Sequence, residues 1–318
     1  MEFEKDLYIV DTDTGVDDAI ALLQAVAAKK KNQIELLCIT AVNGNCSCED
    51  AVRNICRVLD TVNVHDVPLY RGATQPLVVP YTHEKPYHGE DGFNDVKFDT
   101  EPDMSRVKDE HAWNMISELS KQYPNRITLV AIGPLTNIAL AMKLDPGLPT
   151  RLKEIFIMGG NTEGIGNVTA SAEFNFCADP EAASIVLQLT SCPTYIAGWE
   201  LCFKYTKLTR QWRDQVLGTI DKPAAVLAQQ LEMVWFNDYP WGDHWIICDQ
   251  LAMTAALNRS SIKKSSPYNA QVVIGDSLAR GMMVLDQRVL RYKANNVIVI
   301  EELDEEVVKE QMLIAFNQ

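Results

Sequence analysis

Short segments made almost entirely of apolar and β-branched residues alternate along this chain with longer segments of helical periodicity. We expect strands at residues 7–10, 34–42, 127–132, 155–158 and 194–197. Helices are expected between them, at residues 16–31, 47–62, 109–122, 135–144 and 180–190. A strand that is apolar on both faces needs cover on both, and intervening helices connect neighbouring strands in parallel. The alternation therefore predicts an α/β fold, with a parallel sheet covered by helices on both faces.

Two parts of the chain depart from this alternation. Residues 72–106 are rich in proline and glycine without clear periodicity, which is typical of a mobile functional loop. Residues 205–258 are mainly helical and are expected to lie near the active site. Further strands and a last helix are expected at 271–274, 294–300 and 303–315. With 318 residues, 47% of them apolar, the chain can bury one large core, so we expect a single domain over residues 1–318.

Charge and composition exclude several classes of partner. The net charge is −14 and no basic patch is visible, so we expect no nucleic acid partner. The acidic start of the chain has no signal-peptide pattern, and no apolar stretch is long enough to span a bilayer. Cys46 and Cys48 could form half of a zinc site, but no second pair has metal-ligand spacing. We therefore expect a cytoplasmic protein with reduced thiols and no membrane partner.

Four aspartates occur within eight residues, between the first expected strand and the first expected helix. They are Asp11, Asp13, Asp17 and Asp18. Like charges this close repel one another, and a cation or a shared proton offsets the repulsion. Asp17 and Asp18 also suit the positive end of a helix, but that does not explain Asp11 and Asp13. Carboxylates bind Ca²⁺ or Mg²⁺, and open α/β sheets bind ligands at the carboxyl ends of strands, so we expect the active site here.

The first two aspartates allow a second interpretation. An apolar strand followed by Asp-x-Asp-x-Thr resembles the nucleophile motif of the Mg²⁺-dependent haloacid-dehalogenase-like phosphatases. Asp11 would then attack a phosphate, Asp13 would act as acid and base, and Gly275-Asp276-Ser277 could supply a later acidic motif. This interpretation gives no role to Asp17 or Asp18, so it takes second place.

A larger set of motifs resembles the inosine-uridine-type nucleoside hydrolases and covers nearly the whole chain. The first motif, which is quite specific, is Asp11-Thr12-Asp13-Thr14-Gly15-Val16-Asp17-Asp18-Ala19. The other motifs are Asn43-Gly44-Asn45, His88-Gly89-Glu90-Asp91-Gly92, Gly133-Pro134-Leu135-Thr136-Asn137, Met158-Gly159-Gly160, Gly166-Asn167-Val168-Thr169, Ala172-Glu173-Phe174-Asn175, Asp179-Pro180-Glu181-Ala182 and Cys248-Asp249. The resemblance implies a doubly wound, mostly parallel α/β sheet with a Rossmann-like core and one Ca²⁺ at the strand ends.

The resemblance also implies roles for individual residues. The metal ligands would be the carboxylates of Asp13, Asp18 and Asp249 and the backbone carbonyl of Thr136. Asp13 would also be the general base. Residues implied to contact the nucleoside are Asp17, Asn45, Met158, Asn167, Glu173, Phe174, Asn175 and Cys248. The implied reaction is Ca²⁺-dependent hydrolysis of the N-glycosidic bond of ribonucleosides to base and ribose, in nucleoside salvage, by a homodimer or homotetramer.

The chain departs from the family pattern at Cys248, where other members carry His or Trp before the late aspartate. A thiol is a poor proton donor to a leaving base, and Cys248 is more simply a small buried apolar residue. The candidates for activating the base are His88, Tyr239 and His244, with stacking by Trp235, Phe236, Trp241 or Trp245. The missing His also leaves open a non-catalytic nucleoside-binding protein.

Overall fold

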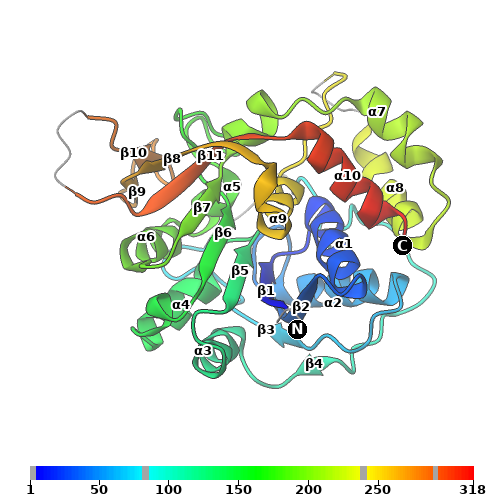
Figure 1. Ribbon diagram of the computed structural model, residues 1–318, viewed down its shortest axis with the longest axis horizontal. Coiled ribbons are helices and arrows are strands. Elements are labelled where there is room, and N and C mark those ends of the chain that lie inside the picture. Colours follow the sequence, from blue (N-terminus) through cyan, green and yellow to red (C-terminus); the bar gives the residue numbers. More distant parts are fainter. Residues whose placement is uncertain (1–4, 81–85, 237–241, 289–292) are drawn as a thin grey trace.

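A large mixed sheet and a separate two-stranded sheet, β10-β9, occur in the computed structural model, which describes residues 5–80, 86–236, 242–288 and 293–318. Among these residues, nine strands pair in the order β4-β3-β2-β1-β5-β6-β7-β11-β8 (Figure 1). Neighbours are parallel except β11 and β8, which are antiparallel. The strands are β1 (Asp6–Thr12), β2 (Ile34–Ala41), β3 (Leu69–Arg71), β4 (Val107–Lys108), β5 (Ile127–Ala131), β6 (Glu154–Met158), β7 (Thr194–Ala197), β8 (Ile262–Tyr268) and β11 (Val297–Leu303).

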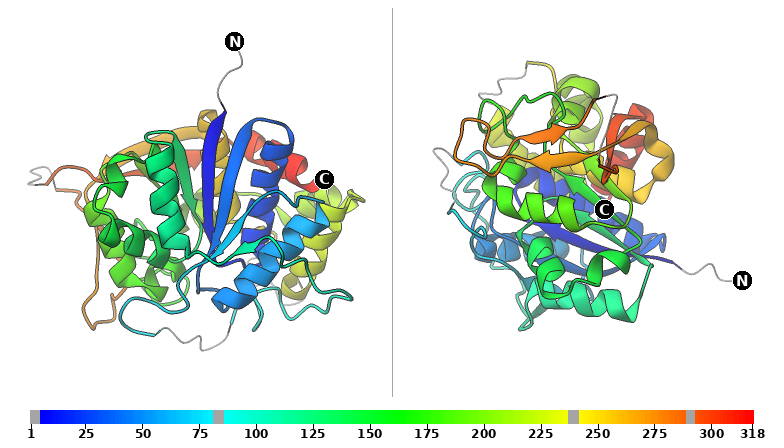
Figure 2. Two further views of the ribbon diagram at one scale, coloured as in Figure 1. Left: turned by 90° about the horizontal axis from the view of Figure 1, so that it is seen from below. Right: turned by 90° about the vertical axis from the view of Figure 1, so that its left-hand side faces the viewer.

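Helices cover both faces of this sheet (Figure 2). One apolar core lies beneath α1 (Val16–Lys30), α2 (Cys48–Thr61), α8 (Pro223–Phe236), α9 (Asp249–Leu257) and α10 (Glu305–Phe316). A second core lies beneath α3 (Ala112–Gln122), α4 (Thr136–Leu144) and α6 (Pro180–Leu189). The remaining elements are η1 (Leu148–Thr150), α5 (Phe174–Ala178), the π-helical η2 (Leu201–Tyr205), α7 (Arg210–Gln215), η3 (Leu217–Thr219), η4 (Arg259–Ser261), β9 (Ala270–Val272) and β10 (Met283–Leu285).

The side chains of β1 show why residues 7–10 of this strand are all apolar. Tyr8 and Val10 belong to the first core, whereas Leu7 and Ile9 belong to the second. Successive side chains of a strand point to opposite faces, so a strand between two helical layers must be apolar at every position. The predicted doubly wound, mostly parallel α/β fold is therefore confirmed.

The order of the strands creates a crevice beside β1. The chain runs outward from β1 through β2 and β3 to β4, and then returns to β5 on the other side of β1. Connections leave β1 and β5 in opposite directions at such a point, which opens a binding crevice at their carboxyl ends. Asp11 lies on β1 and Asp13 directly after it, so the aspartates lie at this edge.

The structure also contains elements that the periodicity did not predict. These include β3, β4, β8, β10 and α5. The last strand in the sheet order, β8, is mainly exposed and contains Pro267, Lys263 and Lys264, so it lacks an apolar signal. Charged residues and proline on an edge strand discourage pairing with another chain. The described parts of the 72–106 segment contain no helix or strand.

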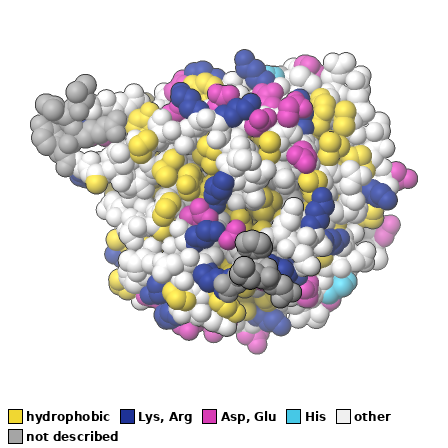
Figure 3. Space-filling view, in the orientation of Figure 1, with side chains coloured by type: hydrophobic (Ala, Val, Ile, Leu, Met, Phe, Trp, Pro, Cys, Tyr) yellow, Lys and Arg dark blue, Asp and Glu magenta, His cyan; other side chains and the backbone are white. Residues whose placement is uncertain are grey.

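The surface adds two observations on partners. On the face shown in Figure 3, lysine and arginine side chains are interspersed with acidic ones rather than gathered into one basic patch. Within the described ranges, every helix is too short or too polar to cross a bilayer.

Candidate active site

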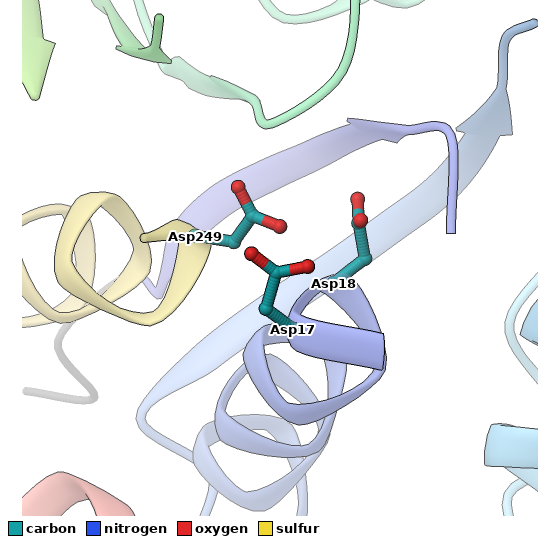
Figure 4. A group of neighbouring side chains, drawn as sticks. All are labelled: Asp17, Asp18 and Asp249. Atoms are coloured by element: carbon teal, nitrogen blue, oxygen red, sulfur yellow. The ribbon is translucent and has the colours of Figure 1, made fainter. Parts of the chain in front are cut away.

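Two helices direct their N-terminal ends at one place on the carboxyl edge of the sheet. Asp17 and Asp18 lie in the first turn of α1, and Asp249 is the first residue of α9, which packs against α1. Carboxylate oxygens of these three residues lie within 4.8 Å of one another (Figure 4). The positive ends of the two helix dipoles partly offset this concentration of negative charge.

Asp18 is held in place from both sides of its carboxylate. Its Oδ1 accepts a hydrogen bond from the Thr12 hydroxyl at 2.6 Å. Its Oδ2 accepts from the Gly15 amide at 2.9 Å and from Asn45 Nδ2 at 3.1 Å. Burial, followed by the charge of Asp17, raises the pKa of Asp18 to about 7. The side chain is therefore fixed at the α1 N-terminus by contacts to three different segments.

Asp13 lies beside this cluster with one free oxygen. Its Oδ2 accepts a hydrogen bond from the Asn45 amide at 2.6 Å. Its Oδ1, like Oδ1 of Asp17, is buried and has no hydrogen-bond partner among the described residues. Burial, followed by the charge of Asp18, raises the pKa of Asp13 well above its usual range. Gly44 leaves room for this carboxylate, because a Cβ there would lie 2.0 Å from Asp13 Oδ2.

The cluster has the properties of a site for a hard cation. Burial and the neighbouring aspartates raise the pKa of Asp249 as well, so the carboxylates cannot all be ionised without a compensating charge. Within the described part of the chain, Asp13 Oδ1 and Asp17 Oδ1 are buried in this cluster without a hydrogen-bond partner, which points to a ligand. The predicted metal set contained Asp13, Asp18 and Asp249, whereas the group whose oxygens lie within 4.8 Å of one another contains Asp17 in place of Asp13. Asn45 joins Asp13 to the group by bonding to both Asp13 and Asp18.

The carbonyl of Ile132, at the carboxyl edge of the sheet, is an alternative to the predicted Thr136 carbonyl as a backbone metal ligand. Thr136 is the first residue of α4, and its hydroxyl donates to Asp179 Oδ2 at 2.7 Å. Ile132 directly follows β5, and its carbonyl accepts from Asn175 Nδ2 at 3.1 Å. A backbone carbonyl carries no side-chain signal in the sequence, so only its position after a strand could have indicated Ile132.

Asn175 and Glu173 form the side of the site above β5 and β6. Asn175 Nδ2 also donates to the Met158 carbonyl at 3.2 Å, which fixes the amide over the ends of both strands. Glu173 is the N-cap of α5, and its carboxylate accepts from the amides of Gly160, Asn175 and Phe176. Burial raises the pKa of Glu173 to about 7. In this arrangement Glu173 orients Asn175 and the glycine turn after β6.

Asn167 and Phe174 lie at the outer end of the same segment. The Phe174 amide donates to Asn167 Oδ1 at 2.9 Å, and the Asn167 side chain is exposed. Hydrogen bonds therefore connect five of the predicted nucleoside contacts along one side of the site, which we call the wall: Met158, Asn167, Glu173, Phe174 and Asn175.

The 72–106 segment reaches the aspartates through His88. The Val16 amide donates to His88 Nδ1 at 3.0 Å, and His88 Nε2 lies 3.7 Å from Asp17 Oδ1. The rings of Tyr87 and Trp235 pack edge-on against the imidazole, with centroids 5.3 and 5.1 Å away. His88 is thus the one predicted histidine that an observed contact places at the cluster, within the described part of the chain.

The described contacts of His244, Trp245 and Phe236 are made with residues other than the aspartates. His244 forms an isolated bridge with Thr209, and no described hydrogen bond or ion pair joins it to the aspartates. Trp245 donates to Glu232 at 2.9 Å, and Phe236 lies beneath the guanidinium of Arg210. Tyr239 and Trp241 lie outside the described residues.

Cys248 is half-buried directly before Asp249. A hydrogen bond that the Cys248 thiol donates to Cys202, followed by burial, raises the pKa of this thiol well above its usual range. The side chain is therefore a neutral thiol, in line with its interpretation as a small apolar residue.

Asp11 has a different environment from the other aspartates. It is fully buried, and its Oδ1 accepts from the Thr40 hydroxyl and from Asn137 Nδ2. Burial raises its pKa to about 7. These contacts tie β1 to β2 and α4, whereas a phosphatase nucleophile would need to face a substrate. Asp276, the second acidic element of that interpretation, is exposed in the β9–β10 connection.

Known proteins resemble this chain over most of its length. A family model described as inosine-uridine preferring nucleoside hydrolase matches residues 8–310. The inosine-uridine preferring nucleoside hydrolase of Leishmania major is 33% identical over 301 residues, 93% of this chain and 92% of that protein. Uridine nucleosidase 1 of Arabidopsis thaliana is 39% identical over 180 residues, 56% of this chain and only 52% of that protein. The solved structure of an inosine-guanosine nucleoside hydrolase has a TM-score of 0.89 at 27% identity, covering 98% of this chain and 99% of that one.

The fold and the site together define a doubly wound α/β protein with an acidic cluster at the sheet edge that could hold a metal ion. The chain belongs to the inosine-uridine preferring nucleoside hydrolase family, as its motifs predicted. Its relatives and structural neighbours are nucleoside hydrolases, so it belongs to the nucleoside N-ribohydrolase class of enzymes. The phosphatase interpretation is not favoured.

Proposed function

We propose that this protein hydrolyses the N-glycosidic bond of ribonucleosides with the help of Ca²⁺, releasing free base and ribose for nucleoside salvage. The observation that carries the proposal is the convergence of Asp17, Asp18 and Asp249 within 4.8 Å, beside the unpartnered Asp13 oxygen. Relatives are named for inosine, uridine and guanosine, which supports ribonucleosides as the substrate class.

The donor set favours Ca²⁺ over softer metals. Asp13, Asp18 and Asp249 would hold the ion together with a backbone carbonyl, for which Thr136 is implied by resemblance and Ile132 by its place after β5. All of these donors are oxygens, which suit calcium better than zinc. When bound, the ion supplies Lewis acidity and a positive charge that orients oxygen ligands.

Asp13 would act as the general base. Its free Oδ1 would accept a proton from the attacking water, whose oxygen then bonds to the anomeric carbon as the bond to the base breaks. Positive charge develops on the ribose in the transition state, and the surrounding carboxylates stabilise it.

The ribose would lie between the α1 N-terminus and the wall above β5 and β6. Asp17 and Asn175 would bind its 2′- and 3′-hydroxyls. Asn45 and Met158 would line the sugar. Asn167, Glu173 and Phe174 would lie on its 5′ side, with Cys248 toward the base. Glu173 contributes there by orienting Asn175, since its oxygens already accept three amides.

A reducing-sugar assay on inosine, adenosine, guanosine, uridine and cytidine tests the proposal. We expect turnover of at least one nucleoside in Ca²⁺, and loss of about a thousandfold or more in Asp13→Ala, the usual scale for removing a catalytic base together with a metal ligand. Asp276→Ala, at an exposed position, is the matched control and should match the wild type. If no ribose is released from any of the five nucleosides with Ca²⁺ bound, the proposal is wrong.

The same measurements separate the alternatives. Tight ribonucleoside binding without turnover would indicate a binding protein. Phosphate release that Asp11→Asn abolishes would indicate a phosphatase. A cytoplasmic location and assembly as a homodimer or homotetramer are part of the proposal, and sedimentation of the purified protein measures the assembly state.

A further inference from the structure

The imidazole of His88 is attached to the first turn of α1. The Val16 amide donates a hydrogen bond to its Nδ1 at 3.0 Å. A backbone N–H can only donate, so Nδ1 is the acceptor and the ring proton lies on Nε2. Gly15 permits this approach, because a Cβ at that position would lie 2.7 Å from Nδ1.

The opposite edge of the same ring faces Asp17. His88 Nε2 lies 3.7 Å from Asp17 Oδ1, a buried oxygen without a hydrogen-bond partner in the described ranges. A small rotation of the carboxylate would close this distance, and catalytic contacts are often long before substrate binds. The rings of Tyr87 and Trp235 pack edge-on against the imidazole, and the Trp235 indole donates to the Tyr87 carbonyl at 3.0 Å. The ring is therefore fixed in orientation.

This geometry does not suit a proton donor to the base. Giving up the Nε2 proton while Nδ1 accepts from Val16 would leave an imidazolate anion, which is a very strong base. Donation from an imidazolium would require a proton on Nδ1, which would abolish the Val16 bond and add a cation at the positive end of α1.

We propose that His88 is a positioning residue, which directs its Nε2–H at Asp17 and so orients the carboxylate that binds the ribose. The inference rests on the proposed nucleoside hydrolase function and extends it. Through His88, the docking of residues 86–95 on α1 and α8 is coupled to recognition of the sugar.

Two substitutions of His88 distinguish the contribution of its Nε2 from that of its Nδ1. In His88→Gln the side-chain amide lies near the position of Nε2 and keeps a donor toward Asp17. In His88→Asn the carbonyl lies near the position of Nδ1 and keeps an acceptor for Val16. If the bond to Asp17 matters, Gln restores activity better than Asn; if only the attachment to α1 matters, Asn restores it better.

The experiment compares two substrates that share the ribose. One is the nucleoside that the wild type cleaves fastest, and the other is p-nitrophenyl β-D-ribofuranoside, whose phenolate leaves without a proton. We expect His88→Ala to lower kcat/KM by about tenfold to a hundredfold, the effect of losing a hydrogen bond to a charged group. The loss should be the same for both substrates, and His88→Gln should recover most of it.

A double-mutant cycle tests that His88 acts through Asp17. Once Asp17→Asn has removed the carboxylate, adding His88→Ala should cost little more, because the two residues form one unit. His111→Gln, at an exposed histidine before α3, is the matched control and should leave both activities unchanged. Circular dichroism melts establish that each variant is folded.

Three results would overturn the inference. Loss confined to the nucleoside, with normal cleavage of the p-nitrophenyl riboside, would make His88 a proton donor. Recovery by Asn but not by Gln would reduce its role to anchoring the loop. Fully additive effects of the His88 and Asp17 substitutions would separate the two residues. Silence of the wild type on both substrates would instead overturn the proposed function, and this inference with it.

Discussion

Gly15 shows how one absent side chain shapes the site. Its φ of −83° is accessible to any residue, so backbone strain does not explain the glycine. A Cβ there would lie 2.7 Å from His88 Nδ1 and 2.8 Å from Asn45 Nδ2, so glycine is required by close approach. Asn45 bonds to both Asp13 and Asp18, and His88 faces Asp17. A methyl group at position 15 would therefore disturb the contacts of three aspartates at once.

We expect Gly15→Ala to lower kcat/KM by about tenfold or more while the protein stays folded, because displacing one charged hydrogen bond already has that effect. Steady-state kinetics and a thermal melt measure the two quantities. Gly275→Ala is the matched control, since a Cβ at that position has nothing within 4 Å. Wild-type kinetics in Gly15→Ala would show that the exact placement of His88 and Asn45 is unimportant.

The segment before α9 is held by a buried charged network rather than by apolar packing alone. Arg213 on α7 donates to Glu232 on α8 through Nε at 3.0 Å, and Trp245 donates to the other Glu232 oxygen at 2.9 Å. All three side chains are buried. The network joins α7 and α8 to the chain four residues before Asp249. It also supports α8, which carries Trp235 to His88.

We expect Glu232→Ala to lower the free energy of unfolding by about 3–5 kcal/mol, because the Arg213 guanidinium would be left buried without its partner. Replacing both residues, as in Arg213→Met with Glu232→Leu, should cost less than the single change. Urea unfolding measures both. Glu306→Ala, which removes an exposed pair with Lys309, should have no measurable effect. A double variant less stable than Glu232→Ala would contradict this account.

At the scale of the whole molecule, the acidic site links stability to pH and calcium. Burial raises the pKa of Asp11 and of Asp18 to about 7, and those of Asp13 and Asp249 also rise. In the unfolded chain these carboxyls titrate near pH 4. Between the two values the folded protein binds more protons than the unfolded chain, so stability falls as the pH rises.

We expect the Tm of the metal-free protein to fall by about 5 °C or more between pH 5 and pH 8, because a loss of a few kcal/mol shifts a chain of this size by that amount. Calcium should restore the Tm at pH 8, because a thousandfold excess of calcium over its Kd raises the free energy of unfolding by about 4 kcal/mol. Scanning fluorimetry in EDTA and in Ca²⁺ measures both effects. A Tm that rises toward pH 8 in EDTA would show that protons do not stabilise the empty cluster.

The sequence by itself determined what depends on neighbouring residues. The alternation of apolar runs and helices specified the doubly wound class, because residues facing two helical layers must be apolar at every position. Asp11, Asp13, Asp17 and Asp18 are contiguous with β1 and α1, so their place at the sheet edge followed from one strand–turn–helix unit. By contrast, β8 escaped prediction, because an exposed edge strand has no apolar pattern.

Only the tertiary structure decided which groups face one another. Asp249 joins Asp17 and Asp18 because α9 packs against α1, and the sequence implied this only through resemblance. The contact of the Ile132 carbonyl with Asn175 spans 43 residues of the chain, and the docking of His88 on Val16 spans 72. Asp11 and Asp13 are two residues apart, yet Asp11 bonds to Thr40 and Asn137, whereas Asp13 bonds to the Asn45 amide beside Asp18. Local patterns reflect periodicity and burial, whereas the direction of each carboxylate is set by contacts between distant segments.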